Sequence, residues 1–153
     1  MKKMFFPVVL AAALILLGAC STVKSVPRHR AVVRLMELIN SSDAEMVSSL
    51  SRIPMLVDGE IVQRPSDVEN FWNLVTKARF AVNTMEDYDI RPVGKDTYRV
   101  FSDTMEVRTF FDKYVPETAV TVTVDSNSGK YVFLLSGRKG RYTYILGFTG
   151  PVE

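Results

Sequence analysis

Few residues in this sequence have side chains that could act as a nucleophile, a general base or a metal ligand. The 153-residue chain has one cysteine, Cys20, and one histidine, His29. A histidine that works as a general base needs an orienting partner and a pocket, whereas His29 stands between Arg28 and Arg30 and is expected to be exposed in a basic patch. One histidine and one cysteine are also too few for a structural zinc site, so no metal or cofactor is expected.

Two clusters of charged residues could bind ions, and for both we favour a simpler interpretation. Glu86, Asp87 and Asp89 have the carboxylate oxygens that Ca²⁺ prefers. The glycine and the closing glutamate of a calcium loop are missing, so this cluster is interpreted as a solvated strand end. The basic segment 138–141, Arg-Lys-Gly-Arg, could contact phosphate or a sulfated sugar, and is interpreted as the charged tip of a hairpin.

The beginning of the chain has the pattern of a secretory leader. Lys2 and Lys3 are followed by sixteen residues, 4–19, without a charged side chain. A membrane-spanning helix needs about 20 apolar residues, so a shorter run after a basic start indicates a cleaved signal peptide. A retained anchor helix is the alternative, and the small residues Gly18 and Ala19 at the end of the run favour cleavage instead.

The residues Leu17-Gly18-Ala19-Cys20 resemble the lipobox of bacterial lipoproteins. The resemblance implies that the Cys20 thiol receives a diacylglycerol, that the peptidase cuts between Ala19 and Cys20, and that the new amine is often acylated, as with palmitate. Two or three acyl chains anchor a protein stably, whereas a single chain binds a bilayer only marginally. Because Ser21 follows Cys20 instead of the usual retention signal Asp, the resemblance also implies an outer-membrane location in a two-membrane cell.

Cleavage before Cys20 would change the charge of the chain and divide it into three parts. The sequence has 19 basic and 17 acidic residues, and removal of Lys2 and Lys3 leaves 17 of each. No basic excess then remains to favour a nucleic-acid partner. We expect a signal peptide at 1–19, a lipidated cysteine with a short tether at 20–27, and one domain over 28–153.

Apolar periodicity predicts three helices in the first half of this domain. The first has one apolar stripe at helical spacing, formed by Val32, Leu35, Met36 and Ile39. Capping boxes at 42–45 (Ser-Asp-Ala-Glu) and 66–69 (Ser-Asp-Val-Glu) predict the starts of the other two, because the Ser oxygen and the Glu side chain satisfy free N–H groups. The third helix has the stripe Val68, Phe71, Trp72 and Val75.

A hairpin and several strands complete the predicted fold. The apolar runs 55–57 and 61–62 flank Asp58-Gly59, a pair that supports the positive φ angles of a tight hairpin turn. After about Phe80 the apolar period changes from 3.6 to 2, and strands are expected to dominate to the end of the chain. We therefore predict an α+β fold in which three N-terminal helices pack on one face of a curved antiparallel sheet.

The order of these elements over residues 28–148 resembles the nuclear transport factor 2-like superfamily, which includes ketosteroid-isomerase-like and polyketide-cyclase-like proteins. The segment that carries the resemblance most clearly is the hairpin leading into the third helix, LSRIPMLVDGEIVQRPSDVENFW. The resemblance implies a cone in which the curved sheet and the helices surround a pocket.

The catalytic residues of the isomerases have no counterpart at matching positions. The isomerases place a tyrosine on an early helix, whereas the first tyrosine here is Tyr88, after all three predicted helices. Their general-base aspartate lies near the leading edge of the first hairpin, and that place reads Ser51-Arg52-Ile53-Pro54 here. Proton abstraction needs a base of suitable pKa within reach of the substrate, so we assign no catalytic residue.

Four aromatic residues are candidates for a pocket wall or a binding face: Trp72, Tyr131, Tyr142 and Tyr144. The spacing of Trp72 is also that of a core residue, whereas each tyrosine combines an apolar ring with a polar end that suits a binding surface.

We therefore expect a membrane-anchored envelope lipoprotein, held in the bilayer by acylated Cys20. Its domain is predicted to be a non-catalytic module that binds a small apolar or amphipathic ligand or a protein partner. One alternative is an isomerase- or cyclase-like enzyme with a rearranged pocket, in which a carboxylate or histidine should face a cavity beside a hydrogen-bond donor. Another is a dimeric scaffold, since open sheets in this superfamily often pair.

Overall fold

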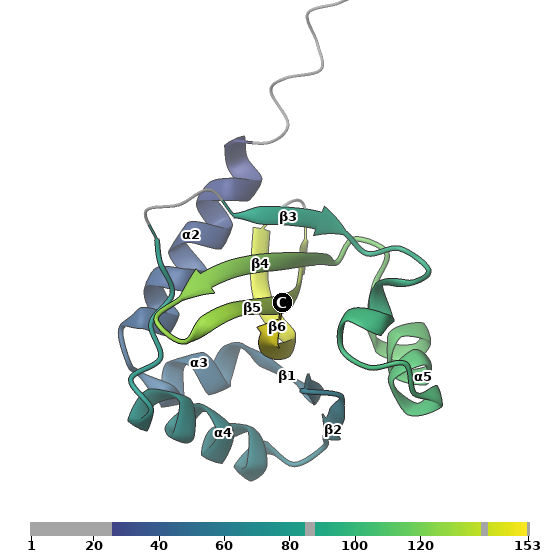
Figure 1. Ribbon diagram of the computed structural model, residues 1–153, viewed down its shortest axis with the longest axis horizontal. Coiled ribbons are helices and arrows are strands. Elements are labelled where there is room, and N and C mark those ends of the chain that lie inside the picture. Colours follow the sequence, from purple (N-terminus) through teal and green to yellow (C-terminus); the bar gives the residue numbers. More distant parts are fainter. Residues whose placement is uncertain (1–25, 85–87, 139–140, 153) are drawn as a thin grey trace, which may run out of the picture.

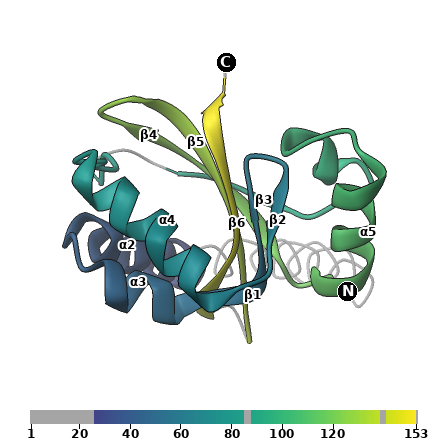
Figure 2. The same ribbon diagram turned by 90° about the horizontal axis from the view of Figure 1, so that it is seen from below.

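A six-stranded sheet divides the molecule into two layers of helices (Figures 1 and 2). The computed structural model describes residues 26–84, 88–138 and 141–152. One face of the sheet is covered by α2 (Val26–Asn40), α3 (Ala44–Leu50) and α4 (Pro65–Lys77). The other face is covered by the 3-10 helix η1 (Thr97–Val100) and by α5 (Met105–Tyr114).

The sheet is mixed, with the strand order β2-β1-β6-β5-β4-β3. Its strands are β1 (Ser51–Val57), β2 (Glu60–Val62), β3 (Asp89–Pro92), β4 (Val120–Ser126), β5 (Gly129–Arg138) and β6 (Arg141–Val152). Neighbouring strands are antiparallel except β1 and β6, which are parallel. The first hairpin therefore joins the sheet through the last strand of the chain.

The predicted α+β class is confirmed, but two parts of the predicted architecture are wrong. The sheet is not wholly antiparallel, because β1 pairs in parallel with β6. The helices do not occupy one face only, because residues 97–114, expected to be strands, form η1 and α5 on the opposite face. Val107, Phe110 and Phe111 have helical spacing and are buried. Because α5 is only 10 residues long, this helical spacing extends over too few residues to stand out in the sequence.

Both predicted capping boxes are wrong in detail, although the helices that they announce exist. The N-cap of α3 is Asp43, whose side chain accepts a hydrogen bond from the Met46 N–H at 2.9 Å. Helix α4 begins at Pro65, and its N-cap Arg64 makes no side-chain capping bond. Proline at the first helical position already has a suitable φ and has no N–H to satisfy, which explains why α4 starts without the box.

The larger core lies between the sheet and helices α2 to α4, and Phe148 of β6 is at its centre. Five aromatic rings have their centroids 5.0 to 5.9 Å from that of Phe148, and they belong to Phe71, Trp72, Phe80, Tyr131 and Phe133. Most of these pairs are tilted or edge-to-face, the arrangements that aromatic rings prefer. This cluster holds α4 and the chain that follows it against the sheet.

The smaller core lies on the opposite face, between the sheet and α5. Leu56, Leu134 and Leu146 supply the sheet side of this core, and Val107 and Phe110 supply the helix side. Successive residues of a strand point to opposite faces, so the central strands contribute to both cores. Burial on both faces explains the apolar character of β5 and β6.

Tyr88 provides a test of packing in the larger core, because it is buried there. Burial raises the pKa of the Tyr88 phenol, and the negative charge of Glu37 raises it further. Above the ordinary tyrosine pKa of 10.0, the unfolded chain loses this proton while the folded chain retains it. Stability should therefore decrease as the pH rises from about 10 through the folded-state pKa.

We expect Tyr88→Phe to weaken this alkaline decrease in the free energy of unfolding, measured by denaturant titration at several pH values from neutral to alkaline. Tyr114→Phe is the matched control, because Tyr114 is 49% exposed and should leave the decrease unchanged. An identical pH dependence in the wild type and Tyr88→Phe would show that Tyr88 does not contribute.

Candidate functional site

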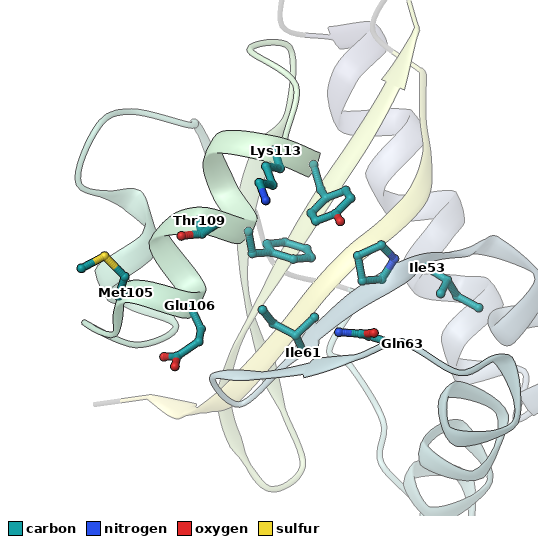
Figure 3. Close-up of a pocket in the computed structure, with 10 residues that line it drawn as sticks. Ile53, Ile61, Gln63, Met105, Glu106, Thr109 and Lys113 are labelled. Carbon is teal, nitrogen blue, oxygen red and sulfur yellow. The ribbon is translucent and has the colours of Figure 1, made fainter.

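A groove with a volume of about 440 Å³ lies between the β1–β2 hairpin and α5 (Figure 3). Its lining comes from these two elements and the residue after β2: Ile53, Pro54, Ile61, Gln63, Met105, Glu106, Thr109, Phe110, Lys113 and Tyr114. Phe110 is the buried floor, because it also belongs to the smaller core. Helix α5 and the hairpin both pack on the smaller core. The groove lies between them, where their outer side chains are not covered by another element.

The hairpin is held in place from two directions. Its turn has positive φ angles at Asp58 (47°) and Gly59 (85°), as a type I′ turn requires. The Asp58 N–H donates to the Phe148 carbonyl at 3.0 Å, and the Asp58 Oδ1 accepts from the Gly150 N–H at 3.0 Å. A Cβ on Gly59 would meet the Ser102 Cβ at 3.1 Å. The turn is thus fixed both to β6 and to the segment that leads into α5.

An irregularity in β1 brings two apolar residues into the groove. Ser51 is opposite Ile145 and Leu56 is opposite Gly147, so β1 has three more residues than β6 between these points. The extra length bends the strand locally, as a bulge does. Ile53 and Pro54 lie within this stretch and line the groove, and Ile53 is 44% exposed.

Helix α5 presents a mixed surface to the groove. The Thr104 side chain caps the helix by accepting from the Val107 N–H at 3.3 Å. Glu106 and Lys113 stand near the two ends of the helix (Figure 3). At a rise of 1.5 Å per residue, seven residues separate these charges by about 10 Å along the axis. The groove therefore has an acidic end and a basic end around an apolar centre.

Exposed apolar side chains are concentrated at this groove. In the described part of the chain, six large apolar residues are well exposed, and three of them line it: Ile53 (44%), Met105 (79%) and Tyr114 (49%). Contiguous apolar surface with a polar rim is typical of interaction sites, whereas isolated exposed apolar residues are ordinary. Ile53 and Met105 lie on opposite sides of the groove (Figure 3), and the presence of three exposed apolar residues along one groove favours a binding surface.

The groove has little of what catalysis requires. Glu106 faces it together with the donors Thr109 and Lys113, but all three residues are exposed, whereas enzyme sites exclude water around the reacting groups. Across residues 26–84, 88–138 and 141–152, no three His, Cys, Asp or Glu side chains are placed to share a metal ion. The arrangement suits binding better than proton transfer.

Three of the four aromatic candidates from the sequence, Trp72, Tyr131 and Tyr144, lie away from the groove. Trp72 is buried in the larger core, where its Nε1 donates to the Ser51 Oγ at 2.8 Å. Tyr131 stacks on Phe148 in the same core. Tyr144 lies beneath Arg52, whose guanidinium carbon is 3.6 Å from the ring centroid. The side chain of Tyr142 lies outside the described residues.

Several other predicted features also fall outside the described residues. Ala19, Cys20, the side chain of His29, Glu86 and Asp87 belong to this group. Among the helices that the structure describes, none is long and apolar enough to cross a membrane.

Sequence reasoning missed the groove because it assigned α5 to strands. Met105 and Tyr114 fall outside the buried stripe of that helix, and such surplus apolar residues are the one signal that could have indicated the site.

Comparisons with protein-family models, curated proteins and solved structures return no match.

Two substitutions on α5 should separate its structural side from its binding side. Phe110 is 1% exposed, so Phe110→Ala should lower the free energy of unfolding by about 3–5 kcal/mol through the lost burial and the cavity. Met105 is 79% exposed, and Met105→Ala should change it by no more than about 0.5 kcal/mol. Urea titration measures both, and a large loss for Met105→Ala would mean that this side chain is structural.

Proposed function

We propose that this protein is a lipid-anchored component of the bacterial cell envelope whose domain is a non-catalytic binding module of the nuclear transport factor 2-like kind. The groove between the β1–β2 hairpin and α5 is its binding site. The observation that carries the proposal is the gathering of exposed Ile53, Met105 and Tyr114 around one depression.

A protein partner suits this groove better than a small molecule. Seven of the ten lining residues are exposed to water, so the groove is shallow. Small-molecule sites usually bury about 70–90% of the ligand surface, which a shallow groove does not achieve. A protein partner with an apolar segment between charged groups would cover the apolar centre and meet Glu106 and Lys113 at the ends.

The lipid anchor would hold the domain close to its membrane. Only residues 21–25 separate Cys20 from the start of α2 at Val26. Five residues span at most about 18 Å even when fully extended. The groove would therefore meet partners that are themselves in or near the membrane, and an outer-membrane location follows from the same lipobox interpretation.

Lipid anchoring predicts a specific loss in the Cys20→Ser variant. The wild-type chain should remain in the membrane fraction, with an intact mass that shows diacylglycerol and further acyl groups after removal of residues 1–19. The variant should lack this mass and leave the membrane fraction. A wild-type chain without acyl mass would contradict the anchor, whatever the domain binds.

Groove binding predicts that apolar-to-polar changes at its rim release the partner. The full chain, extracted gently from its own envelope, is weighed by native mass spectrometry, where a bound partner adds mass that is lost on denaturation. Ile53→Ser combined with Met105→Ser should lower the fraction of chains that carry the partner at least about tenfold, because each substitution removes exposed apolar contact area.

Leu74→Ser is the matched control for this experiment. Leu74 is 64% exposed on α4 and lies outside the groove, so its loss should leave the bound mass unchanged. Equal losses in the control and the groove variant would contradict the assignment of the site. An added mass of a few hundred daltons would identify a small ligand in place of a protein.

A further inference from the structure

We infer that a second copy of this chain pairs with the free edge of β2 in an antiparallel register centred on Val62, which joins the two sheets. The inference goes beyond the groove binding proposed above, and only the expected strengthening on a membrane rests on the proposed lipid anchor. It rests on the geometry of the hairpin, on the sequence of residues 60–64, and on the difference between the two edges of the sheet.

The backbone of β2 has hydrogen-bonding groups that point away from the sheet. Val57 is opposite Glu60, across the two-residue turn, and Met55 is opposite Val62. In an antiparallel ladder, hydrogen-bonded pairs alternate with non-bonded pairs. The turn makes Val57–Glu60 a bonded pair, so Met55–Val62 is the next one. The N–H and C=O of Ile61 therefore face outward, at the edge seen in Figure 1.

The accessible edge is longer than the three residues of β2. The backbone is still extended at Arg64, where φ is −105° and ψ is 133°. The next helix, α4, does not begin until Pro65. Continuation of the alternation makes Gln63 the second residue with outward-facing groups. The edge thus runs over residues 60–64, without a proline, and offers two residues for pairing.

The other edge of the sheet has features that discourage pairing. Strand β3 ends in Pro92, which has no N–H to donate. Its exposed residues Arg91 and Asp89 are joined by an ion pair of 2.7 Å along the same strand. Proline and charged side chains are common devices that protect edge strands. The β2 edge has charges only at its two ends, which suits a selective partner.

Residues 60–64 are complementary to themselves when two copies run antiparallel. With Val62 opposite Val62 of the second copy, Ile61 lies opposite Gln63, and the outward groups of both strands meet. The same register places Glu60 opposite Arg64 on both sides of the two-fold axis. Opposite charges on facing residues stabilise a strand pair, whereas like charges destabilise it. An isologous interface repeats each contact twice.

A second copy on this edge would also extend the groove. Ile61 points towards the smaller core and α5, whereas Val62 points towards the larger core. Facing residues of two paired strands lie on the same face, so Gln63 and Ile61 of the second copy would lie beside Ile61 and Gln63 of the first. The part of the groove lining formed by Ile61 and Gln63 would therefore continue across the two-fold axis.

The pairing should be weak in dilute solution and stronger on a membrane. Exposed ion pairs stabilise a complex little, and the edge is short. Two chains anchored in one bilayer meet at a much higher effective concentration than free chains do.

A cysteine at the centre of the register tests the inference in the full chain in its own membrane. Facing residues of a non-hydrogen-bonded pair have Cα atoms about 4.5 Å apart, which is within the range of about 4.4–6.8 Å that a disulfide spans. Val62→Cys should therefore form a covalent homodimer on mild oxidation. Glu60→Cys is the control, because the same register separates its two copies by about 14 Å.

The outcomes of this experiment are distinct. A dimer of Val62→Cys well above the level in the wild type and in Glu60→Cys supports the pairing. Equal cross-linking at both positions, or none at Val62→Cys, overturns it. A mixed disulfide of a different mass would show that another protein occupies the edge, and would overturn it too.

Charge reversal provides a second, independent measurement by sedimentation of the full chain in detergent. Glu60→Arg alone and Arg64→Glu alone should each raise the dimer dissociation constant about tenfold, because like charges then face each other twice. The double variant should restore it to near the wild-type value. Failure of the restoration overturns this register, while the groove experiment with Ile53 and Met105 remains a separate test of the proposed function.

Discussion

The parallel pairing of β1 with β6 is the constraint on which the rest of this structure depends. The two strands approach closely at Gly147, where a Cβ would meet the Leu56 carbonyl oxygen at 3.1 Å and the Leu56 Cβ at 3.2 Å. A side chain at this position would push the strands apart. Because β1 joins the hairpin to the rest of the sheet through β6, the pairing places both the groove and the free edge of β2.

Burial of the sheet on both faces explains why a binding surface exists where it does. On one side of the sheet, Phe148 of β6 packs in the aromatic cluster with residues of α4. On the other side, Leu146 of β6 belongs to the smaller core together with Phe110 of α5. Helix α5 is short, so its buried stripe covers only part of the hairpin. The apolar residues left at the margin, Ile53 and Met105, are then available for a partner.

The proposed lipid anchor, the shallow groove and the proposed pairing edge of β2 would serve the same kind of task. Each involves contact with another molecule, and none requires a chemical reaction at the surface. Glu106 is exposed to water and Trp72 is part of the larger core, which fits this view. Weak contacts through the groove and the edge would gain strength from confinement to a membrane.

Local sequence was sufficient to predict the features that depend on a few neighbouring residues. The spacing of Val32 and Ile39 predicted a helix, and Asp58-Gly59 predicted the hairpin, because periodicity and turn conformation are short-range properties. The leader and Cys20 are likewise a local pattern, which stays a prediction. The partner of β1, the second helical layer and the groove depend on which apolar surfaces remain to be buried once distant segments meet. Leu56 and Gly147, for example, are far apart in the sequence and become neighbours only when the chain folds. These three features are therefore decided by the tertiary structure alone.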